Sequence, residues 1–173
     1  MELGIMLKTS RLILRELTLD DAAFILELLN EPAFIEFIGD RGVRNIEDAQ
    51  GYITKGPNAS YARHGFGLWL VQKKESFESI GICGLIKRDS LPDIDIGYAF
   101  LARSWSQGYA VEAALAVKDF AIKTLSLKRL VAITNQDNYS SIKVLEKIGL
   151  KFERLIKLAE NEPELKLFAA EYP

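Results

Sequence analysis

The stretch DIGYAFLARSWSQGYAVE, residues 95–112, decides the fold because it leads from a strand directly into a helix. Positions 94, 96, 98 and 100 are large and apolar, whereas the positions between them carry acidic residues and then Gly97 and Ala99. This period of two predicts a strand over 93–100 with one core-like face and one face of small residues. The alanine-rich, apolar segment 107–123 predicts the longest helix of the chain.

The loop between this strand and this helix, Trp105-Ser106-Gln107-Gly108-Tyr109-Ala110, has the features of a phosphate-binding turn. A helix start offers unpaired N–H groups and the positive end of a dipole, so it suits an anion. Gly108 permits close approach of a ligand to the backbone, and Ala110 keeps the first turn uncrowded. The loop is neither a Walker loop nor a dinucleotide fingerprint, because it has one glycine and no Gly-Lys-Ser/Thr. An ordinary strand-to-helix turn remains an alternative.

Working outward, hydrophobic periodicity predicts alternating elements in the order βααα-βββ-α-β-α-ββ. Seven strands are expected, over 11–17, 66–73, 79–87, 93–100, 129–134, 152–158 and 164–170. Five helices are expected, one after the Thr18 cap, then 33–38, one from Asn45 that Gly56-Pro57 ends or interrupts, 107–123, and 139–148 with Gly149 as a left-handed cap. Prolines and glycines are scattered, so we predict a single domain over residues 1–173.

Composition excludes several classes of function. The chain has 173 residues with 22 Lys+Arg against 24 Asp+Glu, a net charge of −2, which argues against a nucleic-acid partner. One cysteine, Cys83, and one histidine, His64, exclude a disulfide framework and a cysteine-based or multi-histidine metal site. No apolar run is long enough to span a membrane, and residues 1–4 do not resemble a signal peptide. We therefore expect a cytoplasmic globular domain without a membrane partner.

Four motifs occur in the order of a known family. They are Thr9-x-Arg11-Leu12-x-Leu14-Arg15, Ile96-Gly97-Tyr98, Trp105-x-x-Gly108-Tyr109-Ala110-x-Glu112-Ala113 and Asn138-x-x-Ser141-Ile142-x-Val144-Leu145-Glu146-Lys147-x-Gly149. The chain thereby resembles the Gcn5-related N-acetyltransferase (GNAT) superfamily, and more narrowly its ribosomal-protein N-terminal acetyltransferase branch. Two positions depart from the superfamily pattern. Trp105 stands where the central motif has Gln or Arg, and Leu145 stands where several relatives carry a tyrosine thought to protonate the leaving thiolate.

The resemblance implies an α/β (α+β) fold, a mixed, mostly antiparallel sheet of about seven strands flanked by helices. A splayed parallel strand pair, 94–101 and 129–134, would form the cleft for acetyl-coenzyme A as acetyl donor. The backbone of Tyr98, Ala99 and Phe100 would bind the pantetheine arm, and Asn138 would lie near the thioester. The pyrophosphate would be bound by the amides of Ser106, Gln107, Gly108, Tyr109, Ala110 and Val111.

Attack of an amine on a thioester needs a neutral amine, a stabilised oxyanion and a leaving thiolate. A backbone N–H near Phe100 can serve the oxyanion. Ser141, one turn into its helix, can donate to the sulfur, although it can also be a helix-start polar residue. For the base, Asp95, Asp93, Glu112 and a water relay stay open, with a solvated strand end as the alternative for both aspartates. Ser141 and Asp95 are the catalytic candidates.

The acceptor is predicted to be a primary amine, either a protein N-terminus or a small molecule such as a polyamine, an amino acid or an antibiotic. An α-amine with a pKa of about 8 is roughly a tenth neutral at pH 7, whereas a lysine with a pKa of about 10.4 is almost fully charged. The α-amine of a protein N-terminus therefore needs less help from a base to lose its proton than a lysine amine does. Two other classes remain, a non-catalytic coenzyme A sensor and a cofactor-free interaction module. A monomer and a homodimer are both compatible with the sequence.

Overall fold

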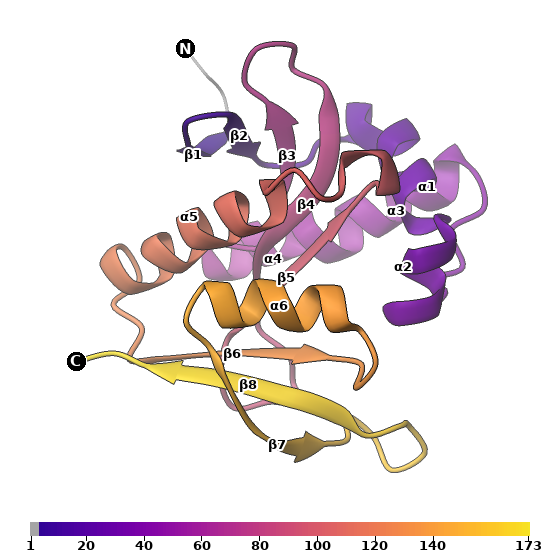
Figure 1. Cartoon of the computed structure of the whole chain (residues 1–173). Helices are drawn as coiled ribbons and strands as arrows, with labels where there is room; N and C mark the ends of the chain where they lie inside the picture. The colour runs from indigo at the N-terminus through magenta and orange to yellow at the C-terminus, as the bar shows by residue number, and fades with distance from the viewer. Residues whose placement is uncertain (1–3) are drawn as a thin grey trace.

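The computed structural model describes residues 4–173 and places eight strands in one sheet (Figure 1). The order across the sheet is β1-β2-β3-β4-β5-β6-β8-β7. The strands are β1 (Ile5–Lys8), β2 (Leu12–Arg15), β3 (Leu68–Lys73), β4 (Ser79–Ile86), β5 (Asp95–Phe100), β6 (Arg129–Thr134), β7 (Lys151–Ile156) and β8 (Leu165–Glu171). β5 and β6 run parallel, and the other neighbouring pairs are antiparallel. The predicted mixed α/β architecture with one parallel pair is confirmed.

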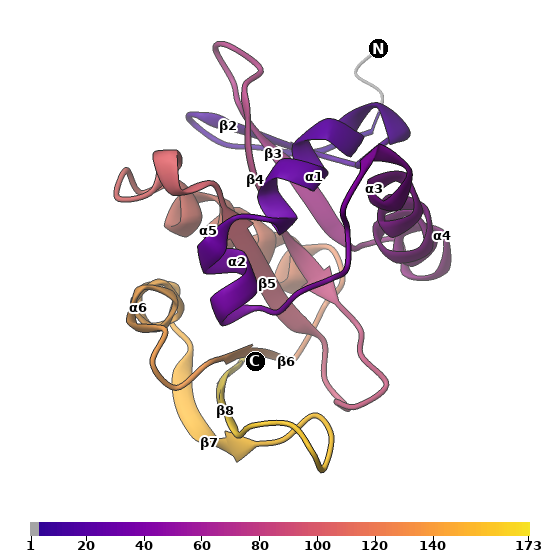
Figure 2. The same ribbon diagram turned by 90° about the vertical axis from the view of Figure 1, so that its right-hand side faces the viewer.

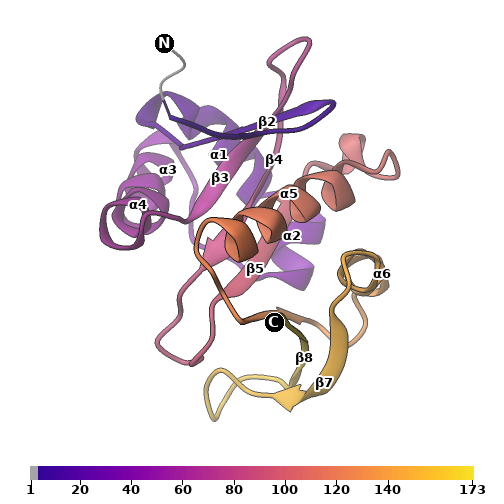
Figure 3. The same cartoon turned by 90° about the vertical axis from the view of Figure 1, so that its left-hand side faces the viewer.

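Helices cover both faces of the sheet. They are α1 (Ala22–Leu29), α2 (Pro32–Phe37), α3 (Ile46–Ile53), α4 (Ala59–His64), α5 (Tyr109–Lys123) and α6 (Tyr139–Lys147). Figures 2 and 3 show α1, α3 and α4 on one face and α5 on the other, with α6 on the same side as α5. The start of α5 lies beside Arg11, next to the first residue of β2, and the start of α6 lies beside Tyr98 of β5.

Two elements in the N-terminal half differ from the sequence prediction. An eighth strand, β1, pairs with β2; it was missed because it is a short edge strand with only four residues. The helix that begins at Asn45 does not end at Pro57 but passes through a π-helical turn, Thr54–Asn58, into α4. His64 is consequently the last residue of α4, and it stacks on Phe66.

Local capping follows the predicted chemistry. Thr18 and Asp21 form a reciprocal capping box ahead of α1, and the Asn45 side chain accepts from the N–H of Asp48 at the start of α3. Gly149 adopts a left-handed conformation (φ 96°) directly after α6. These caps explain why the helices begin and end where the sequence predicts to within a few residues.

The main core lies between the sheet and α5. The inward face of α5 is built of small residues, Ala113, Ala114, Val117 and Ala121, all fully buried. Small side chains let the helix lie close to the strands beneath it, and Trp69 of β3 packs edge-on against Phe120 at 5.2 Å between ring centroids. A second core joins the opposite face of the sheet to α1 and α3. The packing therefore fixes the direction in which the start of α5 points.

No helix within residues 4–173 is both long and apolar enough to cross a bilayer. The same part of the chain holds no cluster of three or more His, Cys, Asp or Glu side chains that can ligate a metal ion. Residues 1–3, which contribute to the expectation that no signal peptide is present, lie outside the described residues.

Candidate functional site

The parallel pair β5–β6 is joined only at one end. Within the described residues, Asp95 and Val131 are the one aligned pair, and the N–H of Val131 donates to the C=O of Ile94 at 3.2 Å. Beyond this point β5 has no aligned partner on its β6 side. Residues 97–99 are only half-buried although β5 lies in the middle of the sheet, because no neighbouring strand covers them. The predicted splayed pair is therefore present.

The backbone of β5 points free N–H groups toward this unpaired edge. The N–H of Leu101 donates to the C=O of Ile80 on β4 at 2.9 Å. Because successive residues of a strand point their backbone groups in opposite directions, the N–H groups of Tyr98 and Phe100 face away from β4. Ala99 faces β4, aligned with Ile82, so its backbone is used in the antiparallel ladder. Three residues were predicted to bind the pantetheine arm through their backbone. The N–H groups of Tyr98 and Phe100 point toward the unpaired edge, as such binding needs. The backbone of Ala99 does not, and Ala99 offers this part of the strand only a small side chain.

Trp105 explains how the loop after β5 is held. Its indole N–H donates to the C=O of Phe100 at 2.9 Å, so it uses an acceptor that faces the unpaired edge. Half of the indole remains exposed (49%). The departure from the usual Gln or Arg at this position thus has a structural role, which is to fold the loop back onto the end of β5.

The loop itself has two left-handed residues, Ser106 (φ 61°) and Gly108 (φ 82°). Only glycine adopts such a conformation without cost, which accounts for Gly108. The first hydrogen bond of α5 runs from the N–H of Glu112 to the C=O of Gly108 at 3.0 Å. The N–H groups of Tyr109, Ala110 and Val111 therefore precede the helical bonding pattern and stay available to an anion.

A clamp from the N-terminal segment holds this loop. Arg11 donates to the C=O of Gln107 at 3.0 Å and to the carboxylate of Glu112 at 2.7 Å, and it stacks on the ring of Tyr109 at 4.3 Å. Glu112 also accepts from Thr9 and from the backbone N–H of Arg11. Partial burial raises the pKa of Glu112, but these hydrogen bonds outweigh it and hold the pKa below its usual range. Glu112 therefore accepts hydrogen bonds that hold the structure together. The sequence analysis gave Arg11 no role, and the structure places it at the centre of this clamp.

The start of α6 brings Ser141 to β5. The Asn138 side chain accepts from the N–H of Ser141 at 3.3 Å and so caps the helix. The hydroxyl of Tyr98 lies 2.9 Å from the hydroxyl of Ser141 and 3.0 Å from its C=O. Leu145, at the position of the tyrosine of several relatives, is 1% exposed and packs in the main core. The hydroxyl groups near the unpaired edge of β5 are therefore those of Tyr98 and Ser141.

Asp95 does not lie at a solvated strand end, contrary to one sequence expectation. It is 1% exposed, and the Nε of Arg88 lies 3.2 and 3.4 Å from its two carboxylate oxygens. Burial raises the pKa of Asp95 to about 6, although Arg88 opposes this. Asp93 instead lies at the surface and binds Arg129 at 3.0 Å. A buried carboxylate with a raised pKa two residues before Gly97 keeps Asp95 a candidate base.

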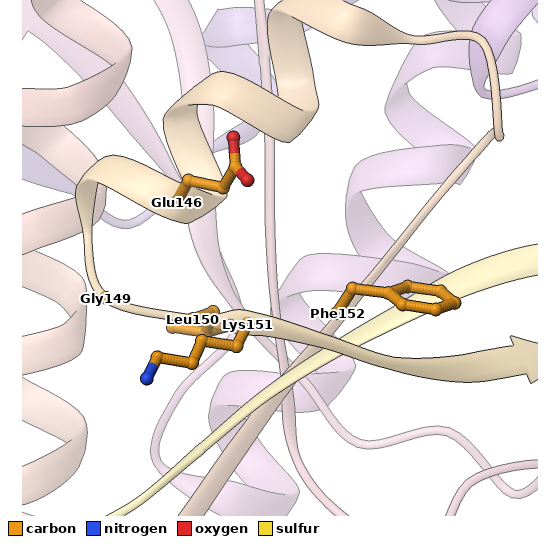
Figure 4. A pocket seen from close by; sticks show the side chains of 5 residues that line it. All are labelled: Glu146, Gly149, Leu150, Lys151 and Phe152. Carbon is orange, nitrogen blue, oxygen red and sulfur yellow. The ribbon is translucent and has the colours of Figure 1, made fainter.

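Two surface hollows lie outside this arrangement. One of about 300 Å³ lies below the C-terminal end of α6 and is lined by Glu146, Gly149, Leu150, Lys151 and Phe152 (Figure 4). A larger one of about 680 Å³ lies between α3 and the segment 41–43, and Arg41 and Tyr52 are among its lining residues. Burial raises the pKa of Tyr52, and the charges of Arg41 and Arg88 oppose this.

His64 and Cys83 take no part in the site. His64 packs against Phe66, and Cys83 is a free, fully buried thiol whose pKa is raised by burial. Arg44 pairs with Asp40 on the surface. Cys83 therefore serves as a small hydrophobic residue of the core.

Comparison with known proteins shows the family of this chain. Residues 11–151 match the acetyltransferase (GNAT) domain family. YkkB of Bacillus subtilis is 33% identical over 54% of this chain and 56% of its own length, so that match spans little more than half of that protein. The uncharacterized N-acetyltransferase YoaA of Bacillus subtilis is 27% identical over 87% of this chain and 85% of its own.

Solved structures share the whole fold. An acetyltransferase from Agrobacterium tumefaciens is 27% identical with a TM-score of 0.82, over 96% of this chain and 94% of its own. The ribosomal α-N-protein acetyltransferase RimL, in complex with coenzyme A, has a TM-score of 0.82 at 17% identity, over 96% of this chain and 97% of its own. At that identity the RimL comparison shows the fold alone.

Proposed function

Since the chain belongs to the GNAT acetyltransferase family, we propose that it transfers the acetyl group of acetyl-coenzyme A to a primary amine, by direct attack within a ternary complex. The acceptor that we propose is a protein N-terminal α-amine. The observation that carries the proposal is the unpaired edge of β5, toward which the N–H groups of Tyr98 and Phe100 point.

The residues present fit the chemical groups of acetyl-coenzyme A. An extended arm with amide groups can pair with the backbone of Tyr98 and Phe100 as an added strand would. The pyrophosphate suits the start of α5, where the left-handed Gly108 exposes the N–H groups of Tyr109, Ala110 and Val111. Ser106 and Gln107 complete the same loop, and Gln107 is fixed there through its C=O by Arg11.

The transfer step needs three groups: a donor for the oxyanion, a donor for the leaving thiolate and a base for the amine. We assign the oxyanion to the N–H of Phe100, which points toward the unpaired edge of β5, because a fixed donor stabilises the charge that develops on the carbonyl oxygen. We assign a hydrogen bond to the leaving thiolate to Ser141. Asp95, with a pKa raised to about 6, lies five residues before Phe100 at the end of β5 that pairs with β6, so as the candidate base it takes the ammonium proton through intervening water.

The acceptor approaches from the face of β5 that carries Gly97 and Ala99. A Cβ at Gly97 would lie 3.0 Å from the Cδ1 of Ile86, so a larger side chain at 97 would crowd this face. Asp95 is on the same face by strand alternation. An α-amine needs little assistance to lose its proton near neutral pH. The naming of RimL as a ribosomal α-N-protein acetyltransferase supports an acceptor of this kind.

Two synthetic peptides test the acceptor. One has a free α-amine and no lysine, and the other has a blocked N-terminus and one internal lysine. With acetyl-coenzyme A present, we expect acetylation of the free α-amine only, detected by mass spectrometry as one added acetyl group. Acetylation of the lysine peptide, or only of polyamines and amino acids in a parallel screen, would contradict the proposed acceptor.

We also propose that the enzyme acts in the cytoplasm, where a free buried thiol such as Cys83 stays reduced. A monomer and a homodimer both remain predictions, and light scattering on the purified protein distinguishes them. Fractionation of cells that express the tagged protein tests the compartment.

A further inference from the structure

The hydroxyls of Tyr98 and Ser141 form a pair that crosses from β5 to α6. They lie 2.9 Å apart, and the Tyr98 hydroxyl is also 3.0 Å from the C=O of Ser141. Both side chains are half-buried. This contact joins β5 to α6, although the two residues are 43 positions apart in sequence. It lies where β5 has no aligned partner on its β6 side.

The number of protons restricts how this pair can bond. A phenol has one proton, and a serine hydroxyl has one proton and two acceptor lone pairs. If Tyr98 donates to the C=O of Ser141, the serine proton can turn toward the Tyr98 oxygen, and the pair is closed. If Tyr98 donates to the serine oxygen, the serine proton is free to point elsewhere. The C=O of Ser141 then keeps its ordinary helical partner four residues on.

An anion next to Ser141 selects the second arrangement. It attracts the serine proton, and the phenol proton then fills the lone pair on the serine oxygen. Hydrogen bonds in such a chain polarise one another, so the serine becomes a better donor than an isolated hydroxyl. Burial raises the pKa of Tyr98, so the phenol keeps its proton throughout and acts through Ser141.

We propose that Tyr98 is a positioning residue that orients the hydroxyl of Ser141 toward the sulfur of coenzyme A and strengthens its hydrogen bond to the leaving thiolate. This rests on the proposed function, which places the sulfur beside Ser141. No proton leaves Tyr98 in this step, because the thiolate departs as an anion that accepts a hydrogen bond. Tyr98 and Ser141 together supply a hydrogen-bond donor that Leu145, which is buried in the core, cannot provide.

The pKa of the thiol of bound coenzyme A tests this without any acceptor. Coenzyme A itself is the probe, and the ultraviolet absorbance of its thiolate is titrated in complex with the full chain. In the wild type we expect the thiol pKa to lie about one unit below that of a free thiol, about 8.5. Tyr98→Phe and Ser141→Ala should each raise it by most of that unit. The double variant should match Ser141→Ala, because Tyr98 acts only through Ser141.

Matched variants separate orientation from a general loss of structure. Tyr172→Phe removes another tyrosine hydroxyl, one that is buried and has no hydrogen-bond partner within the described residues, and it should leave the thiol pKa unchanged. Ser141→Thr keeps a hydroxyl and should retain the lowered pKa. The melting temperature of each variant shows whether that variant is still folded.

The outcomes separate this inference from the proposed function. If the wild type does not bind coenzyme A at all, the proposed function fails and the inference fails with it. If coenzyme A binds but its thiol pKa is the same in wild type, Tyr98→Phe and Ser141→Ala, only the positioning role is overturned. A raised pKa in Ser141→Ala with no change in Tyr98→Phe would assign the donor to Ser141 alone and contradict the role of Tyr98.

Discussion

The guanidinium of Arg11 and the carboxylate of Glu112 lie 2.7 Å apart although 101 residues separate them in sequence. The same guanidinium holds the C=O of Gln107, so one side chain ties the end of the loop to the first turn of α5. A loop that is ordered before its ligand arrives does not have to lose conformational entropy on binding. The clamp therefore links the start of β2 to the affinity of the predicted pyrophosphate site.

Replacing Arg11 with Met should weaken acetyl-coenzyme A binding about five-fold. Arg11 is partly exposed (44%), so its ion pair contributes only about 1 kcal/mol or less. Arg154→Met, which removes an exposed arginine on β7, is the matched control and should bind normally. Calorimetric titration of both variants measures the two dissociation constants, and equal affinities would remove the clamp from the cofactor site.

Gly108→Val should lower acetyl-coenzyme A affinity by more than ten-fold. A valine at φ 82° is strained, and its side chain would project toward the Arg11 guanidinium, 3.3 Å from the added Cβ. Gly65→Val is the control, because Gly65 has a similar φ of 78° but open space around it, away from the loop. Both variants should lose about 1–2 kcal/mol of stability, and only Gly108→Val should lose binding. Unchanged affinity in Gly108→Val would exclude the pyrophosphate assignment.

Much of the fold follows from the sequence because its patterns are local. The alternation at 94–100, the apolar face of 107–123 and the caps at Thr18, Asn45 and Gly149 each depend on residues within one or two turns. The edge strand β1 escaped prediction because it has only four residues. The π-helical turn at Thr54–Asn58 escaped prediction because Gly56-Pro57 reads locally as a helix breaker, whereas the structure holds Pro57 inside a continuous helical segment.

The site was less predictable than the fold because its decisive contacts join segments far apart in the chain. The loop was singled out by its composition and its place before a helix, whereas Ser141 and Asp95 became candidates only through the family resemblance and the chemistry that it implies. The burial of Asp95 was missed, since only the fold brings Arg88 against it. The Tyr98–Ser141 pair depends on the distance between β5 and α6, for which the sequence carries no local signal.

Asp95 should make stability depend on pH. Its folded-state pKa is about 6 against an unaltered value of 3.8, so the folded state holds this proton to higher pH than the unfolded state does. The free energy of unfolding therefore falls as pH rises from about 4 to about 6. By pH 7 the stability lost by ionising the buried carboxyl reaches its full value of about 3 kcal/mol. Below pH 4 both states are protonated and the cost disappears.

Asp95→Asn removes that titration. Relative to the wild type, its free energy of unfolding should rise by about 3 kcal/mol between pH 4 and pH 7, as measured by urea unfolding. Asp119→Asn, which changes an exposed carboxyl on α5, should show no such trend. A constant difference between Asp95→Asn and wild type across this range would show that the buried carboxyl does not titrate there.

Cys83 should be inert toward thiol reagents in the folded protein. It is fully buried and its pKa is raised, so little reactive thiolate forms near neutral pH. Ellman's reagent should therefore detect no thiol in the native protein and one per chain in denaturant. Rapid labelling of native protein would contradict the burial of β4, and slow labelling leaves free-thiol release usable as an assay for acetyl transfer.

The most direct test of the central claim is thermal unfolding with and without acetyl-coenzyme A, with ATP as a nucleotide control. A ligand at a hundred times its dissociation constant adds about 2.7 kcal/mol of stability, which raises the Tm of a chain of this size by about 5–10 °C. The account predicts this rise with acetyl-coenzyme A and none with ATP. No rise at saturating acetyl-coenzyme A, or an equal rise with ATP, would contradict it.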